Sequence, residues 1–134
     1  MTLKRVGATL AAALALVSSS ALVNAAPAAA LGGCPVNQLC LYAGVNFNYM
    51  DFRTGTVSGC WYWPNYSTAH NRQIVSYVND LPVNASLWKP NPVNRVYYDA
   101  VATIRPGGFS TSTGSSSAFS MVDYVCTGSA SPNH

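Results

Sequence analysis

The sequence has few charged residues and no glutamate. Aspartate occurs four times, lysine and arginine together occur seven times, and charged residues make up 8% of the chain. The basic residues form no cluster, although such a cluster is the usual electrostatic footprint of a nucleic-acid-binding protein, so we expect no nucleic-acid partner. With two histidines and no GxSxG motif, the chain also offers little for acid–base or nucleophilic catalysis. We therefore expect a protein that is not an enzyme.

No apolar run is long enough to cross a membrane. The apolar run at residues 6–17 is shorter than the roughly 20 residues that a transmembrane helix needs. It follows Lys4 and Arg5 and precedes small residues, a pattern typical of a secretory signal peptide. We expect residues 1–25 to be the signal peptide and residues 26–33 to be a flexible segment. The mature protein is then secreted, extracellular and not bound to a membrane.

Cysteine is scarce but even in number, and the four residues are Cys34, Cys40, Cys60 and Cys126. In an exported chain, this number favours two disulfides over a zinc or redox site. Three pairings are possible. The proline-containing loop from Cys34 to Cys40 can fold back on itself, which favours that bond and leaves Cys60 to pair with Cys126. No CxxC spacing occurs, and neither histidine lies at ligand spacing from a cysteine, so we expect no metal and no cofactor.

An amphipathic helical pattern of useful length is also missing. Instead, Gly, Pro, Ser and Asn interrupt β-prone runs about every ten residues, which is typical of an all-β sandwich or small barrel. The predicted strands are residues 39–42, 49–53, 60–63, 75–79, 86–89, 95–99, 101–104 and 118–125. Composition predicts a flexible loop at residues 107–117. We expect one domain over residues 34–126 and a disordered tail at residues 127–134.

The chain repeats itself on either side of a break at Pro90 to Pro92. Residues 41–45 (LYAGV) are echoed by residues 97–101 (YYDAV), and residues 74–79 (IVSYVN) by residues 118–123 (AFSMVD). Self-similarity of this kind indicates a fold built from two similar units. We therefore expect two half-domains of four short strands each, packed face to face and stabilised by the disulfides.

Two aromatic residues mark the first half. Tyr42 and Phe47 are five residues apart across a predicted turn, so their rings can stack over a folded-back hairpin. This spacing resembles the βγ-crystallin Greek-key signature, in which a glycine stands two residues after the second aromatic. Here that position holds Tyr49. If the backbone needs a positive φ there, Tyr49 is strained.

A longer resemblance covers residues 34–126. It is carried by CPVNQLCLYAGVNF, NRQIVSYVND, RVYYDA, a later PGG and a closing AFSMVDY. Together these segments look like the secreted actinobacterial peptidase inhibitor family thirty-six, whose founding member is a small metalloproteinase inhibitor of βγ-crystallin-like fold. The resemblance implies an all-β, βγ-crystallin-like Greek-key sandwich whose partner is an extracellular peptidase. An aromatic-rich insert at residues 61–70 departs from the family pattern.

The aromatic insert holds the first candidate for an inhibitory contact loop, formed by Tyr62, Pro64, Asn65 and Tyr66. Tyrosine gives a large contact area at little entropic cost, so a stiffened loop of this kind suits another protein's groove. The alternative is that Trp61 and Trp63 pack in the core and that Tyr62 is only a surface ring.

Lys89 and Asn91 mark a second candidate loop, which the neighbouring prolines Pro90 and Pro92 hold extended. The alternative is that this segment is a plain linker between the two halves.

Residues 71–76 occupy the position at which many βγ-crystallin domains bind calcium. Arg72 and Val75 stand where that pattern has oxygen ligands, and a cationic side chain opposes a hard cation. We therefore expect structural serines here and no calcium dependence.

Two functions remain open at this stage. The first is a monomeric peptidase inhibitor, of a metalloendopeptidase if the family resemblance holds, that inserts a preorganised loop into the enzyme's cleft. The second is a non-inhibitory extracellular module that recognises a cell-wall, glycan or protein surface through exposed aromatic rings.

Overall fold

The computed structural model describes residues 30–134, so the predicted signal peptide and the first part of residues 26–33 lie outside the described residues. Within this range the chain is all-β, as the sequence predicts, with no α-helix. The strands are β1 (Leu39–Tyr42), β2 (Met50–Thr54), β3 (Gly59–Tyr62), β4 (Ser76–Asn79), β5 (Ala85–Pro90), β6 (Tyr98–Ile104), β7 (Phe109–Ser110) and β8 (Tyr124–Thr127). Short 3-10 turns join them: η1 (Leu31–Gly33), η2 (Val45–Phe47), η3 (Trp63–Asn65), η4 (His70–Arg72) and η5 (Ser117–Phe119).

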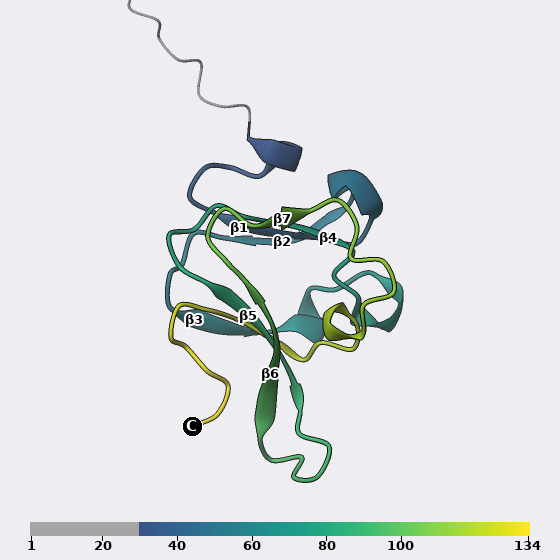
Figure 1. Cartoon of the computed structure of the whole chain (residues 1–134), viewed down its shortest axis with the longest axis vertical. Helices are drawn as coiled ribbons and strands as arrows, with labels where there is room; N and C mark the ends of the chain where they lie inside the picture. Colours follow the sequence, from purple (N-terminus) through teal and green to yellow (C-terminus); the bar gives the residue numbers. More distant parts are fainter. Residues whose placement is uncertain (1–29) are drawn as a thin grey trace, which may run out of the picture.

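The strands form two antiparallel sheets of four. Sheet A has the order β2-β1-β4-β7, and sheet B has the order β3-β8-β5-β6. Figure 1 shows sheet A at the top of the molecule and sheet B below it. If the halves are taken as β1–β4 and β5–β8, each sheet combines three strands from one half with one strand from the other, because β3 pairs with β8 and β7 pairs with β4. The sheets are therefore not the two contiguous halves that the repeat suggested.

The main core lies between the two sheets. Leu39 and Leu41 from β1 pack with Leu87 from β5 and Val125 from β8, and Trp63 is buried among them. In β5 the alternate residues Ala85 and Leu87 are buried, as strand geometry requires for a face that points inward. Each fully buried aliphatic side chain contributes about 1.5–3 kcal/mol relative to exposure. This layer accounts for most of the apolar burial that holds the sheets together.

A smaller cluster covers the outer face of sheet A. Tyr42 and Phe47 contribute rings whose centroids lie 5.5 Å apart in an edge-to-face arrangement. The Tyr42 hydroxyl donates to the Gly32 carbonyl at 2.9 Å, which fastens η1 to β1. Burial raises the pKa of the Tyr42 phenol above its ordinary value. Residues 30–33, expected to be flexible, are thus attached to the sheet at Gly32.

The repeat is real in the structure, but its units differ from those expected. β1 and β5 are corresponding strands, because the two sheets have matching orders, β2-β1-β4-β7 and, read in reverse, β6-β5-β8-β3. Both also carry a register shift at the same place, between Leu41 and Tyr42 in β1 and between Leu87 and Trp88 in β5. The sequence echo aligned residues 41–45 with residues 97–101, which belong to the loop after β5 and to β6. This alignment was wrong because it rested on similar tyrosine-containing sequences. The position of a strand in the sheet depends instead on which strands it pairs with.

Both disulfides are present, Cys34–Cys40 and Cys60–Cys126, and they follow the pairing that the sequence favours. They close loops with sequence separations of 6 and 66 residues. Cys34–Cys40 lies in the small cluster, whereas Cys60–Cys126 joins directly opposite residues of β3 and β8.

Three segments differ from the sequence predictions. Residues 107–117 contain β7, which pairs with β4. They are also tied to the segment just before β4, since Thr113 donates its backbone N–H to the Val75 carbonyl and its hydroxyl to the Ile74 carbonyl. The segment predicted as a strand at 118–125 is a turn and bend until β8 begins at Tyr124. The tail predicted from residue 127 begins with the buried end of β8. Ser and Gly content predicts flexibility, but it carries no information on these long-range hydrogen bonds.

None of the helical turns within residues 30–134 has the length or apolar character that a membrane-crossing helix requires.

Candidate functional site

A two-stranded ribbon projects from sheet B. β8 flanks β5 only as far as Trp88, which lies opposite Tyr124. Beyond that point Lys89 and Pro90 pair only with β6, opposite Asp99 and Tyr98. Pro90 is tolerated because no strand needs a hydrogen bond on its other side. Figure 1 shows this hairpin of β5 and β6 extending away from the body of the molecule.

The loop at the tip of the hairpin is closed by side chains of asparagine. Asn91 Oδ1 accepts from the backbone N–H groups of Val93 at 2.9 Å and Asn94 at 2.8 Å. Asn94 Oδ1 accepts in turn from the N–H of Val96 at 3.1 Å. The backbone of Asn91 donates to the Tyr97 carbonyl at 2.8 Å. These Asx turns, together with two prolines, give the tip a defined conformation before any partner binds.

The base of the hairpin is held on its outer edge by the C-terminal segment. Asn133 accepts a hydrogen bond from the Tyr98 N–H and donates one to the Tyr98 carbonyl, both at 2.8 Å. The Tyr98 ring lies 4.9 Å from that of Tyr124, which lies 5.3 Å from that of Tyr62. Burial, followed by the neighbouring Tyr124 and Asp123, raises the pKa of the Tyr98 phenol. Residues expected to form a free tail therefore support the ribbon.

Apolar side chains are exposed at the tip. Val93 is 94% exposed and Val96 is 79% exposed, and Tyr97 is also largely exposed. Single exposed apolar residues are common on protein surfaces. Here three of them occur within five positions of one stiffened loop that stands clear of the body, an arrangement typical of an interaction site.

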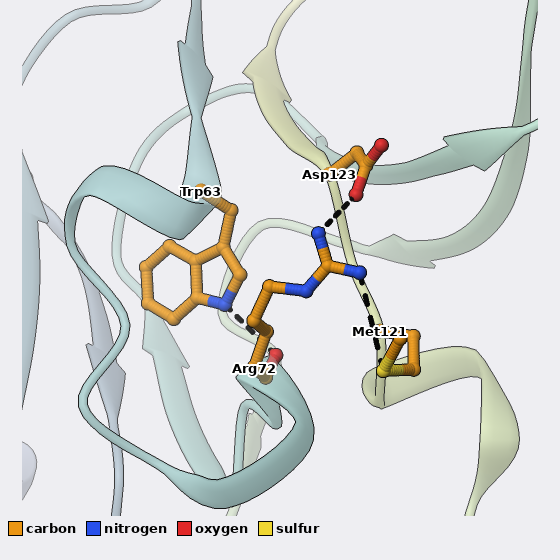
Figure 2. Close-up of polar contacts among 4 residues, drawn as sticks. All are labelled: Trp63, Arg72, Met121 and Asp123. Carbon is orange, nitrogen blue, oxygen red and sulfur yellow. Dashed lines mark hydrogen bonds and ion pairs between the residues drawn. The ribbon is translucent and has the colours of Figure 1, made fainter.

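Close to the ribbon, Arg72 is held in a strained conformation by contacts from three directions. Its φ is +51°, in the left-handed region that non-glycine residues rarely adopt. Trp63 Nε1 donates to the Arg72 carbonyl at 2.9 Å. Arg72 Nη1 lies 2.5 Å from Asp123 Oδ1, and Nη2 contacts the sulfur of Met121 at 3.9 Å. Figure 2 shows the guanidinium reaching from its turn toward Asp123 and Met121.

Lys89 joins this group from the ribbon side. Its ammonium donates to the Ser117 carbonyl. Partial burial, with a smaller contribution from the charge of Arg72, lowers the pKa of the Lys89 amine. Lys89 and Asn91, both predicted as contact residues, thus stand at the base and tip of the hairpin, which is a turn within the second half and not a linker between halves.

The other predicted contact loop is built differently. Trp63 is fully buried and Trp61 is packed against the core, so the alternative core interpretation holds for both tryptophans. Tyr66 packs its ring against Phe52 at 5.0 Å. Tyr62 lies on the outer face of sheet B beside Tyr124. The remaining two residues, Pro64 and Asn65, form part of η3.

The predicted contact residues therefore fall in two separate places, and the exposed tip residues Val93, Val96 and Tyr97 were missed. The sequence signal that marks them is the run NPVN, in which two asparagines three residues apart can each cap a turn. The expected strand at residues 95–99 concealed it.

The former calcium candidate is a structural turn. Ser76 Oγ donates to the Gly44 carbonyl at 2.6 Å and accepts from the Phe47 N–H at 3.1 Å, so this buried hydroxyl links β4 to η2. Within residues 30–134 no three His, Cys, Asp or Glu side chains gather where they could hold a metal ion.

Comparisons with protein-family models, characterised proteins and solved structures found no match for this chain.

Proposed function

We propose that this protein is a secreted inhibitor of an extracellular peptidase, with a βγ-crystallin-like fold, and that the β5–β6 hairpin enters the cleft of the enzyme. The observation that carries the proposal is the stiffened apolar tip of a projecting ribbon. A preorganised loop loses little conformational entropy on binding, so more of the contact energy appears as affinity. An inhibitor of this kind needs no chemistry of its own.

The fold part of the proposal is supported by the first half of the chain. Tyr42 and Phe47 lie ring against ring, as the βγ-crystallin signature implies. Tyr49, at the position where that signature has glycine, has a φ of +57°. The backbone thus adopts there a conformation for which glycine is the usual choice. Both observations agree with the fold that the family resemblance implies.

Secretion is supported by the two disulfides, because such bonds persist in oxidising environments outside the cytosol. The class of peptidase rests on the family resemblance, which implies a zinc endopeptidase of thermolysin type. A hydrophobic subsite in such an enzyme suits an aliphatic side chain such as Val93 or Val96. Burying either side chain is worth about 1.5–3 kcal/mol.

The test is a titration against a panel of metallo-, serine and cysteine endopeptidases, with protein purified from the medium of a host that exports the full-length chain. We expect inhibition of at least one metalloendopeptidase at equimolar concentration. The reduced and alkylated protein is the control and is expected to have no effect. Full activity of every enzyme at micromolar inhibitor would contradict the proposal.

The competing function is a module that binds a glycan or cell-wall surface through its tyrosines. The row Tyr62, Tyr124 and Tyr98 on sheet B favours it, since these rings are partly exposed. However, neighbouring rings are inclined by 56° and 80°, so they do not form one flat platform for sugar rings. Sedimentation with purified cell-wall material discriminates the two functions, because retention on the wall without inhibition favours the module.

A further inference from the structure

A groove of about 360 Å³ lies between the hairpin and the turns that carry Arg72 and Met121. Its apolar walls are Pro90 and Pro92 on the hairpin and Met121 on the opposite side. Met121 is held there by its own left-handed conformation, with a φ of +54°, and by a backbone hydrogen bond from its N–H to the Asn71 carbonyl at 2.7 Å. The wall of the groove opposite the hairpin is thus fixed in position.

The polar lining of the groove is strongly positive. Of the five lysines and arginines within residues 30–134, three line it, namely Arg72, Lys89 and Arg95, and no carboxylate does. Arg72 Nη1 donates to the Asp123 carboxylate, while Arg72 Nη2 contacts only the sulfur of Met121. Partial burial, and secondarily the charge of Arg72, lowers the pKa of the Lys89 amine. A carboxylate bound in the groove would offset the part that comes from Arg72.

The balance of charges around the groove limits which anion fits. Asp123 and Asp99 stand beside it, the first paired with Arg72 and the second accepting from Asn91 Nδ2 at 3.0 Å. Three cations thus exceed two carboxylates by one charge. This suits a single carboxylate better than a phosphate polymer or other polyanion. The proline and methionine walls suit the methylene groups of an amino-acid side chain.

We propose that this groove binds an Asp or Glu side chain carried by the protein against which the hairpin docks. The groove and the tip are continuous, since Asn91, Pro92 and Arg95 belong to both. A partner that contacts Val93 and Val96 therefore passes over the groove. That this partner is a peptidase rests on the proposed function, but the preference for a carboxylate does not.

The groove would then contribute more to the choice of partner than to the affinity for that partner. Charges at the rim of an interface mainly raise the association rate and fix orientation, and salt screens them. A peptidase with an acidic residue beside its cleft would be bound faster than one with a neutral or basic residue there.

The test is an NMR titration of the ¹⁵N-labelled, exported protein with two capped peptides, acetyl-Ala-Glu-Ala-amide and acetyl-Ala-Gln-Ala-amide. The only charge that differs between them is the glutamate carboxylate. We expect saturable shifts for the glutamate peptide, in the millimolar range, at the amides of Lys89, Asn91 and Arg95 and at Arg72 Nε. The glutamine peptide should bind about two- to fivefold more weakly, as a single partly exposed charge contact predicts.

Matched variants locate the site. Lys89→Gln and Arg95→Gln should each weaken binding of the glutamate peptide by about two- to fivefold. Changes in the spectrum of the free protein should be confined to the neighbours of the substituted side chain, including Ser117 for Lys89→Gln. Arg105→Gln is the control, since Arg105 is exposed and follows the far end of β6, about 20 Å from Asp99 by strand rise. The Arg105→Gln variant should bind the glutamate peptide as tightly as the unmodified protein does.

Three results would overturn the proposal: equal shifts with both peptides, no saturable shifts at these four residues, or tighter binding of inorganic phosphate than of the glutamate peptide. The titration contains no enzyme. Its failure would leave the proposed inhibition standing, and failure of inhibition would leave the carboxylate preference of the groove standing.

Discussion

Left-handed backbone conformations at residues other than glycine recur in the tight turns of this protein. Consecutive pairs occur at Asn46 and Phe47 in η2 and at Asn71 and Arg72 in η4. Asparagine tolerates this region because its short side chain can hydrogen-bond locally, whereas larger residues pay about 1–2 kcal/mol. Such strain is compatible with folding only where packing and hydrogen bonds fix the turn, as the Trp63 bond to Arg72 does.

Tyr49 is another non-glycine residue in the left-handed region, with a φ of +57° and a side chain that is 80% exposed. We predict that Tyr49→Gly raises the free energy of unfolding by about 0.5 kcal/mol, because relief of about 1–2 kcal/mol of strain exceeds the added chain entropy of glycine. Urea denaturation measures the change. Tyr97→Gly, at an exposed tyrosine without positive φ, is the control and should not stabilise. The Tyr49 ring lies against Gly44. Loss of stability in Tyr49→Gly would show that this ring contact contributes more than relief of the backbone strain.

At the scale of strands, the sequence predicts the core elements well. β1 is predicted to the residue, and β2 to β5 within one residue at each end. In these strands, apolar residues alternate or run continuously between turn residues. Such a pattern within a short stretch of sequence is enough to predict a buried strand. The core placement of Trp61 and Trp63, the alternative interpretation of the aromatic insert, is confirmed.

The remaining elements depend on long-range pairing, which the local pattern does not contain. β7 lies in a Ser/Gly-rich stretch and exists because it pairs with β4. The tip of the hairpin is shaped by hydrogen bonds between Asn91 and residues two and three positions later, so its valines resemble a strand in sequence but are exposed. For the candidate site, Lys89 and Asn91 are predicted from the sequence as contact residues, but the exposed apolar residues that follow them are not.

The disulfide between β3 and β8 should matter more for stability than the one before β1. The chain-entropy estimate gives about 4.4 kcal/mol for the Cys60–Cys126 loop and about 2.4 kcal/mol for the Cys34–Cys40 loop. We predict that replacing Cys60 and Cys126 with Ser costs about 2 kcal/mol more than replacing the other pair. Urea denaturation of both double variants measures the difference. A greater loss in the Cys34/Cys40 variant would show that attaching the N-terminal turn contributes more than linking β3 to β8.

For the whole molecule, stability and binding are assigned to different parts. The core between the sheets and the two disulfides hold the body together, whereas residues 91–97 contribute no member to either core cluster. The tip therefore tolerates substitution without loss of the fold, as expected of a loop that a rigid scaffold presents to a partner. The groove beside it adds a charged contact that the tip alone does not offer.

The most direct test of this account is the inhibition constant of a variant with a shortened hairpin, measured on the peptidase that the panel identifies. Residues 91–97 are replaced by Asn-Gly, a two-residue turn that can join the paired residues Pro90 and Tyr98. Tyr66→Ala in the other candidate loop is the control.

If the hairpin enters the cleft, the shortened variant should keep its thermal midpoint and its inhibition constant should rise about 100-fold or more, since losing two buried valines removes at least about 3 kcal/mol. Tyr66→Ala should inhibit like the unmodified protein. An unchanged inhibition constant in the shortened variant, or a large loss in a folded Tyr66→Ala, would contradict the account.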